Sequence, residues 1–238
     1  MKERVSLIIG STPVILIAPH GSDDTNTDII AESAAHKLNC YAVINRGFER
    51  DETVDVNNDK ANCNRIDHCR EDVVFDEFLK PICKFTEQIK NKGILATMAE
   101  EQNVVNIFHI HGCGDIVHKI AGETVEVIAG YGLGLKNDSL TCEFWKKNVF
   151  VALYRKFCLH GDIFEGMGGG KYAGRDKNNM NQYFKNIDPC VESMQLEFPF
   201  SCRNTPDKAR YTGENLAFVL KNYLKCDKYD VSVLSKLI

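Results

Sequence analysis

The chain has 238 residues, of which 29 are Lys or Arg and 33 are Asp or Glu, so its formal net charge is −4. This slightly acidic balance gives no basic patch of the kind that nucleic-acid-binding proteins need. No apolar run reaches the roughly 18 residues that a membrane-spanning helix requires. We therefore expect no nucleic-acid partner and no membrane, and the sequence does not specify an oligomeric state.

Ten cysteines and seven histidines are the unusual feature of the composition. The cysteines fall short of the ~8–10% that marks a small disulfide scaffold, and none of them forms a CxxC pair of the kind found in zinc ribbons. Gly10, Ser11 and Pro13 interrupt the apolar N-terminal stretch, so it does not resemble a signal peptide. These features predict a reduced, cytoplasmic protein.

Apolar runs rich in β-branched residues alternate with stretches of helical periodicity, which is typical of an α/β domain with a mostly parallel sheet. The expected strands are residues 5–9, 14–18, 41–45, 104–111, 125–129 and 194–198. The expected helices are residues 25–38, 71–92, 142–159 and 213–224, and Pro81 should kink or divide the second. The polar, glycine-rich residues 161–181 are expected to form a functional loop. No linker or repeat interrupts this pattern, so we expect one domain over residues 1–238.

Three of the expected strands are rich in polar residues at or near their carboxyl ends, where α/β sheets bind their ligands. The segments are PHGSDD at 19–24, HIHG at 109–112 and MQLEFP at 194–199. A catalytic zinc ion takes three protein ligands and leaves its fourth position to water. His20 and His111, together with one carboxylate, would satisfy that need. The alternative is that each histidine is a hydrogen-bonded structural residue.

Glu197 lies inside an otherwise apolar strand, where an acidic side chain is rarely buried unless it is paired. It is either salt-bridged to an arginine or a general base whose pKa is raised by burial. Asn64 and Arg65 form a natural receptor for a substrate carboxylate, because Arg binds carboxylates through two hydrogen bonds. Arg175, in the glycine-rich loop, could reach the same cleft. The alternative for each arginine is a solvated surface position.

The order of these motifs, PHG, NR, HxHG, GG…R and QLE, resembles that of the N-formylglutamate amidohydrolase family, a branch of the zinc carboxypeptidase-like hydrolases. The resemblance extends from His20 to about Arg203. It implies a single three-layer domain of the phosphorylase/hydrolase-like type, and one Zn²⁺ per chain. The expected substrate is a carboxylate-bearing amide such as an N-acyl amino acid.

The resemblance also assigns roles to individual residues. It implies metal ligands at His20, at Asp23 or Asp24, and at His111. Substrate binding is expected at Asn64, Arg65 and Arg175, with Arg175 and Glu197 as catalytic residues. The chain departs from the family at His109 and Asn62, where an acidic residue is usual, and His109 is a reserve ligand.

Three other functions remain open at this point. A γ-glutamyl peptide hydrolase would have the same fold and metal. A binding or sensor protein would keep the fold and bind an acyl amino acid without turnover, and the substitutions at Asn62 and His109 favour it. A thiol-based function would require a reactive cysteine, and Cys113, next to the His111 turn, is the positioned candidate.

Overall fold

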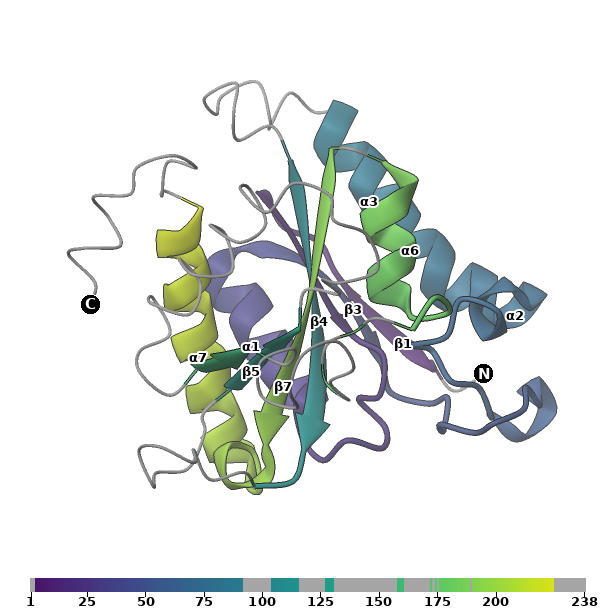
Figure 1. The fold of residues 1–238 in the computed structure, drawn as a ribbon, viewed down its shortest axis with the longest axis horizontal. Helices are drawn as coiled ribbons and strands as arrows, with labels where there is room; N and C mark the ends of the chain where they lie inside the picture. The colour runs from purple at the N-terminus through teal and green to yellow at the C-terminus, as the bar shows by residue number, and fades with distance from the viewer. Residues whose placement is uncertain are drawn as a thin grey trace.

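The computed structural model describes residues 3–91, 104–115, 127–130, 158–160, 172, 174, 176–188 and 190–224, with the backbone alone for 158–160. Figure 1 shows a central sheet with helices on both of its faces. The sheet has seven strands in the order β1-β3-β2-β4-β7-β5-β6. The strands are β1 (Val5–Ile8), β2 (Thr12–Ala18), β3 (Cys40–Asn45), β4 (Val105–Cys113), β5 (Val127–Gly130), β6 (Cys158–His160) and β7 (Val191–Pro199).

The four central strands β3, β2, β4 and β7 are parallel to one another. β1 is antiparallel to β3, and β5 is antiparallel to β7 and parallel to β6. The expected α/β class with a mostly parallel mixed sheet is therefore confirmed. The carboxyl ends of β2, β4 and β7 meet at one edge of the sheet, which is where a ligand site is expected in such folds.

Helices α1 (Thr27–Leu38) and α7 (Pro206–Tyr223) cover one face of the sheet, and α3 (Lys80–Asn91) and α6 (Met180–Ile187) cover the other (Figure 1). Alternate residues of each central strand enter the two cores. In β2, Leu16 packs in the core beneath α1 and α7, whereas Ile15 and Ile17 pack in the core beneath α3 and α6. Both faces of these strands are buried, and β2 and β3 are accordingly almost continuously apolar.

The expected helix 71–92 is divided just before its proline. It consists of α2 (Asp72–Val74), a π-helical turn (Phe75–Leu79) and α3, in which Pro81 is the second residue. Proline lacks the N–H that would continue the hydrogen-bond ladder, and it is tolerated in the first turn of a helix. Shorter 3₁₀ turns lie at Val56–Asn58, His68–Arg70 and Phe200–Cys202.

Other expectations differ from the structure at helix ends. α7 begins at Pro206 and not at 213, because Thr205 caps it and a proline fits its first position. The expected helix 142–159 is wrong at its end, where Cys158–His160 form β6, and residues 142–157 lie outside the described residues. α6 begins within the expected loop 161–181, most of which is also outside the described residues. Among the helices that the structure describes, none is both long and apolar enough to cross a bilayer.

Candidate active site

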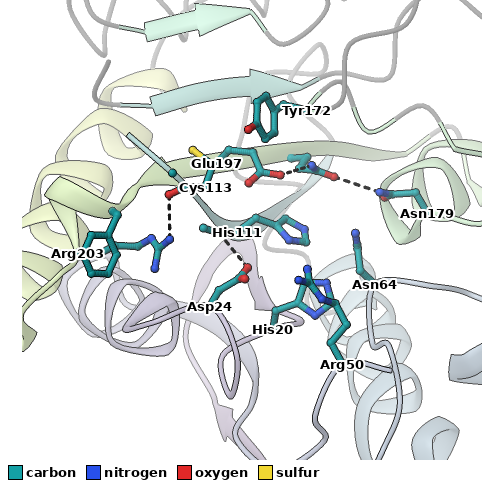
Figure 2. Close-up of a pocket in the computed structure, with 14 residues that line it drawn as sticks. His20, Asp24, Arg50, Asn64, His111, Cys113, Tyr172, Asn179, Glu197 and Arg203 are labelled. Atoms are coloured by element: carbon teal, nitrogen blue, oxygen red, sulfur yellow. Dashed lines mark hydrogen bonds between the residues drawn. The ribbon is translucent and has the colours of Figure 1, made fainter. Parts of the chain in front are cut away.

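A cavity of about 540 Å³ lies at the carboxyl ends of β2, β4 and β7 (Figure 2). β2 contributes His20, two residues after its end, β4 contributes His111, and β7 contributes Glu197. His111 and Glu197 are register partners on neighbouring parallel strands, so their side chains lie next to each other on one face of the sheet. The fold thus brings the polar residues of three expected strands into one cavity.

The two histidines lie side by side and are buried. Their ring centroids are 5.3 Å apart, with the ring planes tilted by 58°. Burial lowers the pKa of His20 well below its ordinary value and that of His111 to about 3, so both imidazoles are neutral. His20 Nδ1 and His111 Nε2 are buried without a hydrogen-bond partner among the described residues. Buried polar atoms are nearly always satisfied in native proteins, so these two atoms indicate a missing partner.

The two aspartates after His20 have different surroundings. The carboxylate of Asp24 lines the cavity and accepts a hydrogen bond of 3.0 Å from the Gly112 N–H, and burial raises its pKa. The carboxylate of Asp23 instead accepts a bond of 2.8 Å from the Arg50 N–H, and Asp23 does not line the cavity. Of the two aspartates left open by the sequence, the structure therefore brings only Asp24 to the histidines.

Two of the expected metal donors, the imidazoles of His20 and His111, lie together in the cavity. Neutral imidazole nitrogens without partners are what a zinc ion needs from histidine. Across the part of the chain that the structure describes, however, no three His, Cys, Asp or Glu side chains form a ready metal-binding group. The donors fit a metal at His20 and His111, and Asp24 is the cavity carboxylate available as a third ligand.

Glu197 is held by a chain of amide side chains that starts at a helix cap. Asn179 caps α6 and donates a hydrogen bond of 3.2 Å to Gln195 Oε1. Gln195 Nε2 in turn donates a bond of 2.6 Å to Glu197 Oε1. The Glu197 side chain is buried and lines the cavity (Figure 2). Its carboxylate is thereby fixed at the cavity wall, as a general base requires.

The residues expected to bind a substrate carboxylate separate in the structure. Asn64 lines the cavity, and its buried Oδ1 atom has no hydrogen-bond partner among the described residues. Arg65 does not line the cavity and is a correction to the expected site. Its guanidinium faces Asp67, with bonds of 3.1 Å and 2.6 Å to the two carboxylate oxygens. Arg175 lies outside the described residues.

Two other arginines line the cavity instead. Arg50 lies close enough to His20 and His111 to contribute to the lowering of their pKa values. Arg203 follows β7 and is buried. The only sequence signal for either residue is its position: Arg50 lies upstream of the NR pair, and Arg203 lies six residues after Glu197.

His109 and Cys113 do not add to the chemistry of the site. His109 does not line the cavity, and its Nε2 atom is 2.8 Å from Ser193 Oγ. Cys113 lines the cavity, but burial raises the pKa of its thiol to about 12. A reactive cysteine needs a lowered pKa, so this position weighs against the thiol-based function.

Comparison with known proteins identifies solved structures with a similar fold. No protein-family model matches the sequence, and no curated protein matches it. Among solved structures, the gene product Atu2144 from Agrobacterium tumefaciens superposes with a TM-score of 0.56 at 12% identity, over 94% of this chain and 95% of that chain.

Two larger proteins are also similar, one from Burkholderia mallei and one from Shewanella denitrificans, each provisionally named a carboxypeptidase or carboxypeptidase A. Their TM-scores are 0.53 and 0.51 at 12% identity, over 93% of this chain. This chain spans about three fifths of their length, 59% and 60%. At such identities the likeness concerns the fold alone, and that fold is a carboxypeptidase-like α/β domain.

Proposed function

We propose that the chain is a zinc-dependent hydrolase that cleaves the amide bond of a carboxylate-bearing N-acyl amino acid, of the N-formylglutamate type. The observation that carries this proposal is a pair of buried imidazole nitrogens, His20 Nδ1 and His111 Nε2, in the same cavity as Glu197. Neither nitrogen has a hydrogen-bond partner among the described residues. The carboxypeptidase-like fold is consistent with it. The resemblance of the sequence motifs to the amidohydrolase family supports the choice of bond and substrate.

His20, His111 and Asp24 would hold one zinc ion. When bound, zinc acts as a Lewis acid and lowers the pKa of water to about 7, which makes a nucleophile available at neutral pH. The neutral imidazoles favour this role because their nitrogen lone pairs are free. Asp24 accepts the Gly112 N–H through Oδ2, so Oδ1 would be its oxygen for the metal.

Glu197 would take the proton of the attacking water and deliver it to the nitrogen of the leaving amine. The hydrogen bond from Gln195 to Oε1 orients the carboxylate for this task. Arg50, which lines the cavity, would stabilise the developing negative charge on the amide oxygen, and Arg175 is a second candidate for the same role. The amide C–N bond breaks, and the products are a carboxylic acid and an amine.

The test is the substitution Glu197→Gln, which keeps the shape of the side chain and removes its basicity. We expect kcat for amide hydrolysis to fall by about 10²–10⁴, while zinc content measured by mass spectrometry stays near one per chain. Glu192→Gln is the matched control, because Glu192 lies on the same strand outside the cavity. If the purified protein holds no metal and Glu197→Gln leaves hydrolysis of every amide unchanged, the proposal fails.

A screen of N-formyl, N-acetyl and γ-glutamyl substrates separates the alternatives. Cleavage of γ-glutamyl amides alone would assign a γ-glutamyl peptide hydrolase. The departures from the family at Asn62 and His109 favour the second candidate, a binding protein for acyl amino acids. Stoichiometric binding of an N-acyl amino acid with no product formed would support that candidate over the hydrolase.

A further inference from the structure

We propose that Arg203 is the receptor for a carboxylate of the ligand, on the wall of the cavity formed by the ends of β4 and β7. This inference deepens the proposed function and rests on it for the class of ligand. It replaces Arg65, which the sequence favoured for this role. The argument comes from how the guanidinium is buried, bonded and charged.

Arg203 is almost completely buried, with 5% of its surface exposed, yet it lines the cavity. Buried arginines are normally paired with a carboxylate, because an uncompensated charge is costly to bury. Arg203 forms no ion pair within 4.0 Å among the described residues. Its charge offsets part of the rise that burial causes in the pKa of Asp24, and it contributes to lowering the pKa of Asp115, so these carboxylates lie nearby.

Three main-chain carbonyls hold the guanidinium in place. Nε donates to Phe198 O at 2.9 Å, Nη1 to Thr25 O at 2.7 Å and Nη2 to Cys113 O at 3.0 Å. These bonds connect the end of β7, the segment before α1 and the end of β4. A guanidinium has five N–H groups, so two of them have no acceptor among the described residues and can serve a ligand. Figure 2 shows the group directed toward the middle of the cavity, between Cys113 and Asp24.

The neighbouring strand leaves room for this position. A Cβ atom on Gly112 would lie 2.4 Å from Arg203 Cζ, which is closer than atoms can approach. Any other residue after His111 would therefore displace the guanidinium. The Phe200 ring, 5.7 Å from Arg203 Cζ, adds an apolar surface beside the charge. A cation fixed in this way, next to an apolar wall, suits a carboxylate on a short hydrocarbon chain.

Arg65 lacks each of these properties. It is at the surface, it is already paired with Asp67 through two bonds, and it does not line the cavity. A substrate carboxylate that binds Arg65 would have to share its guanidinium with Asp67. Binding of the carboxylate at Arg203 and binding at Arg65 are therefore two distinct hypotheses. Substitution of each arginine in turn discriminates between the two hypotheses.

The experiment measures equilibrium binding of glutarate and of its neutral diamide, glutaramide, to the full chain by calorimetry. We expect glutarate to bind wild-type protein at least about tenfold more tightly than glutaramide. Arg203→Met should abolish that preference. Arg203→Lys keeps the charge but loses the planar guanidinium that binds a carboxylate through two hydrogen bonds, so it should weaken the preference. Arg65→Met and Arg210→Met should leave it unchanged, since Arg210 lies on α7 away from the cavity.

Arg203→Met removes three hydrogen bonds and could prevent folding, so a second measurement uses the wild-type protein. The NMR signal of the Arg203 Nε–H group, assigned by its loss in Arg203→Lys, should shift with glutarate and not with glutaramide. An unchanged signal, or loss of the glutarate preference in Arg65→Met with its retention in Arg203→Met, overturns the inference. Binding that depends on Arg203 without hydrolysis of any amide would contradict the proposed function alone.

Discussion

Asp23 and Asp24 are adjacent in sequence, but their carboxylates serve different neighbours. Asp23 holds the Arg50 N–H, and Asp24 holds the Gly112 N–H beside His111. An asparagine at either position can still accept the same main-chain bond through its side-chain oxygen. Each Asp→Asn substitution therefore tests the carboxylate charge with little change to the loop.

We expect Asp24→Asn to lower the affinity for zinc by at least about tenfold. Asp23→Asn should change it by less than about twofold, because its carboxylate lies outside the cavity. Competition with a coloured zinc chelator measures both constants under the same conditions. A large loss in Asp23→Asn with none in Asp24→Asn would show that Asp23 is the ligand and that the turn rearranges on metal binding.

At the residue scale, the sequence could place the strand-end residues but not the direction of long side chains. His20, His111 and Glu197 follow from where apolar runs end and from the two-residue period of a strand. The positions of the Arg65 and Arg203 side chains do not follow from these patterns, because a long, flexible arginine binds whichever acceptors the folded chain brings near it. Arg65 is paired with the nearby Asp67, whereas Arg203 donates to the nearby Phe198 carbonyl and to two carbonyls distant in sequence, those of Thr25 and Cys113.

At the scale of elements, the packing of α7 on α1 depends on Gly213. This glycine was expected to begin the last helix, but it lies in the middle of α7 and faces α1. A Cβ atom there would lie 2.5 Å from Ile30 O and 2.9 Å from Ser33 Cβ. The glycine is therefore explained by the contact between the two helices and not by a helix end.

Gly213→Ala should destabilise the protein although alanine is the better helix former. Alanine gains about 1 kcal/mol in helix propensity, but forcing an atom into a packed contact costs about 1–3 kcal/mol or more. Because the clash includes the backbone of α1, we expect a net loss of about 1–2 kcal/mol, measured by urea unfolding. Exposed Glu214→Ala should stay within about 0.5 kcal/mol of wild type. Equal or greater stability of Gly213→Ala would mean that the helices separate at no cost.

The elements that the sequence could predict are those defined by periodicity. The central strands are apolar on both faces and α1 has clear boundaries, so these were found to within a few residues. α6 was missed because it begins in a polar, glycine-rich stretch that shows no helical pattern of apolar residues. Its contacts with the core that includes β7 form only in the folded protein. The early start of α7 was signalled by Thr205 and Pro206, which the apolar pattern alone does not register.

At the scale of the whole molecule, the cavity joins parts of the chain that are far apart in sequence. His20 lies between β2 and α1, and His111 lies in β4, in the centre of the sheet. A ligand that binds both imidazoles links these segments in the folded protein only. Such a ligand must stabilise the fold as a whole, by an amount set by its affinity and concentration.

Zinc at about 100 times its dissociation constant should raise the free energy of unfolding by about 2.7 kcal/mol, and a chelator should reverse the change. Zinc also binds unfolded cysteine and histidine side chains, so the comparison between variants is the informative quantity. His111→Ala should abolish the stabilisation, whereas His36→Ala, at an exposed position on α1, should retain it. Chemical unfolding with and without zinc measures the free energy of unfolding of the wild type and of the two variants. Equal stabilisation of wild type and His111→Ala would place the zinc away from the cavity, because the site would then not include the imidazole that the fold leaves without a partner.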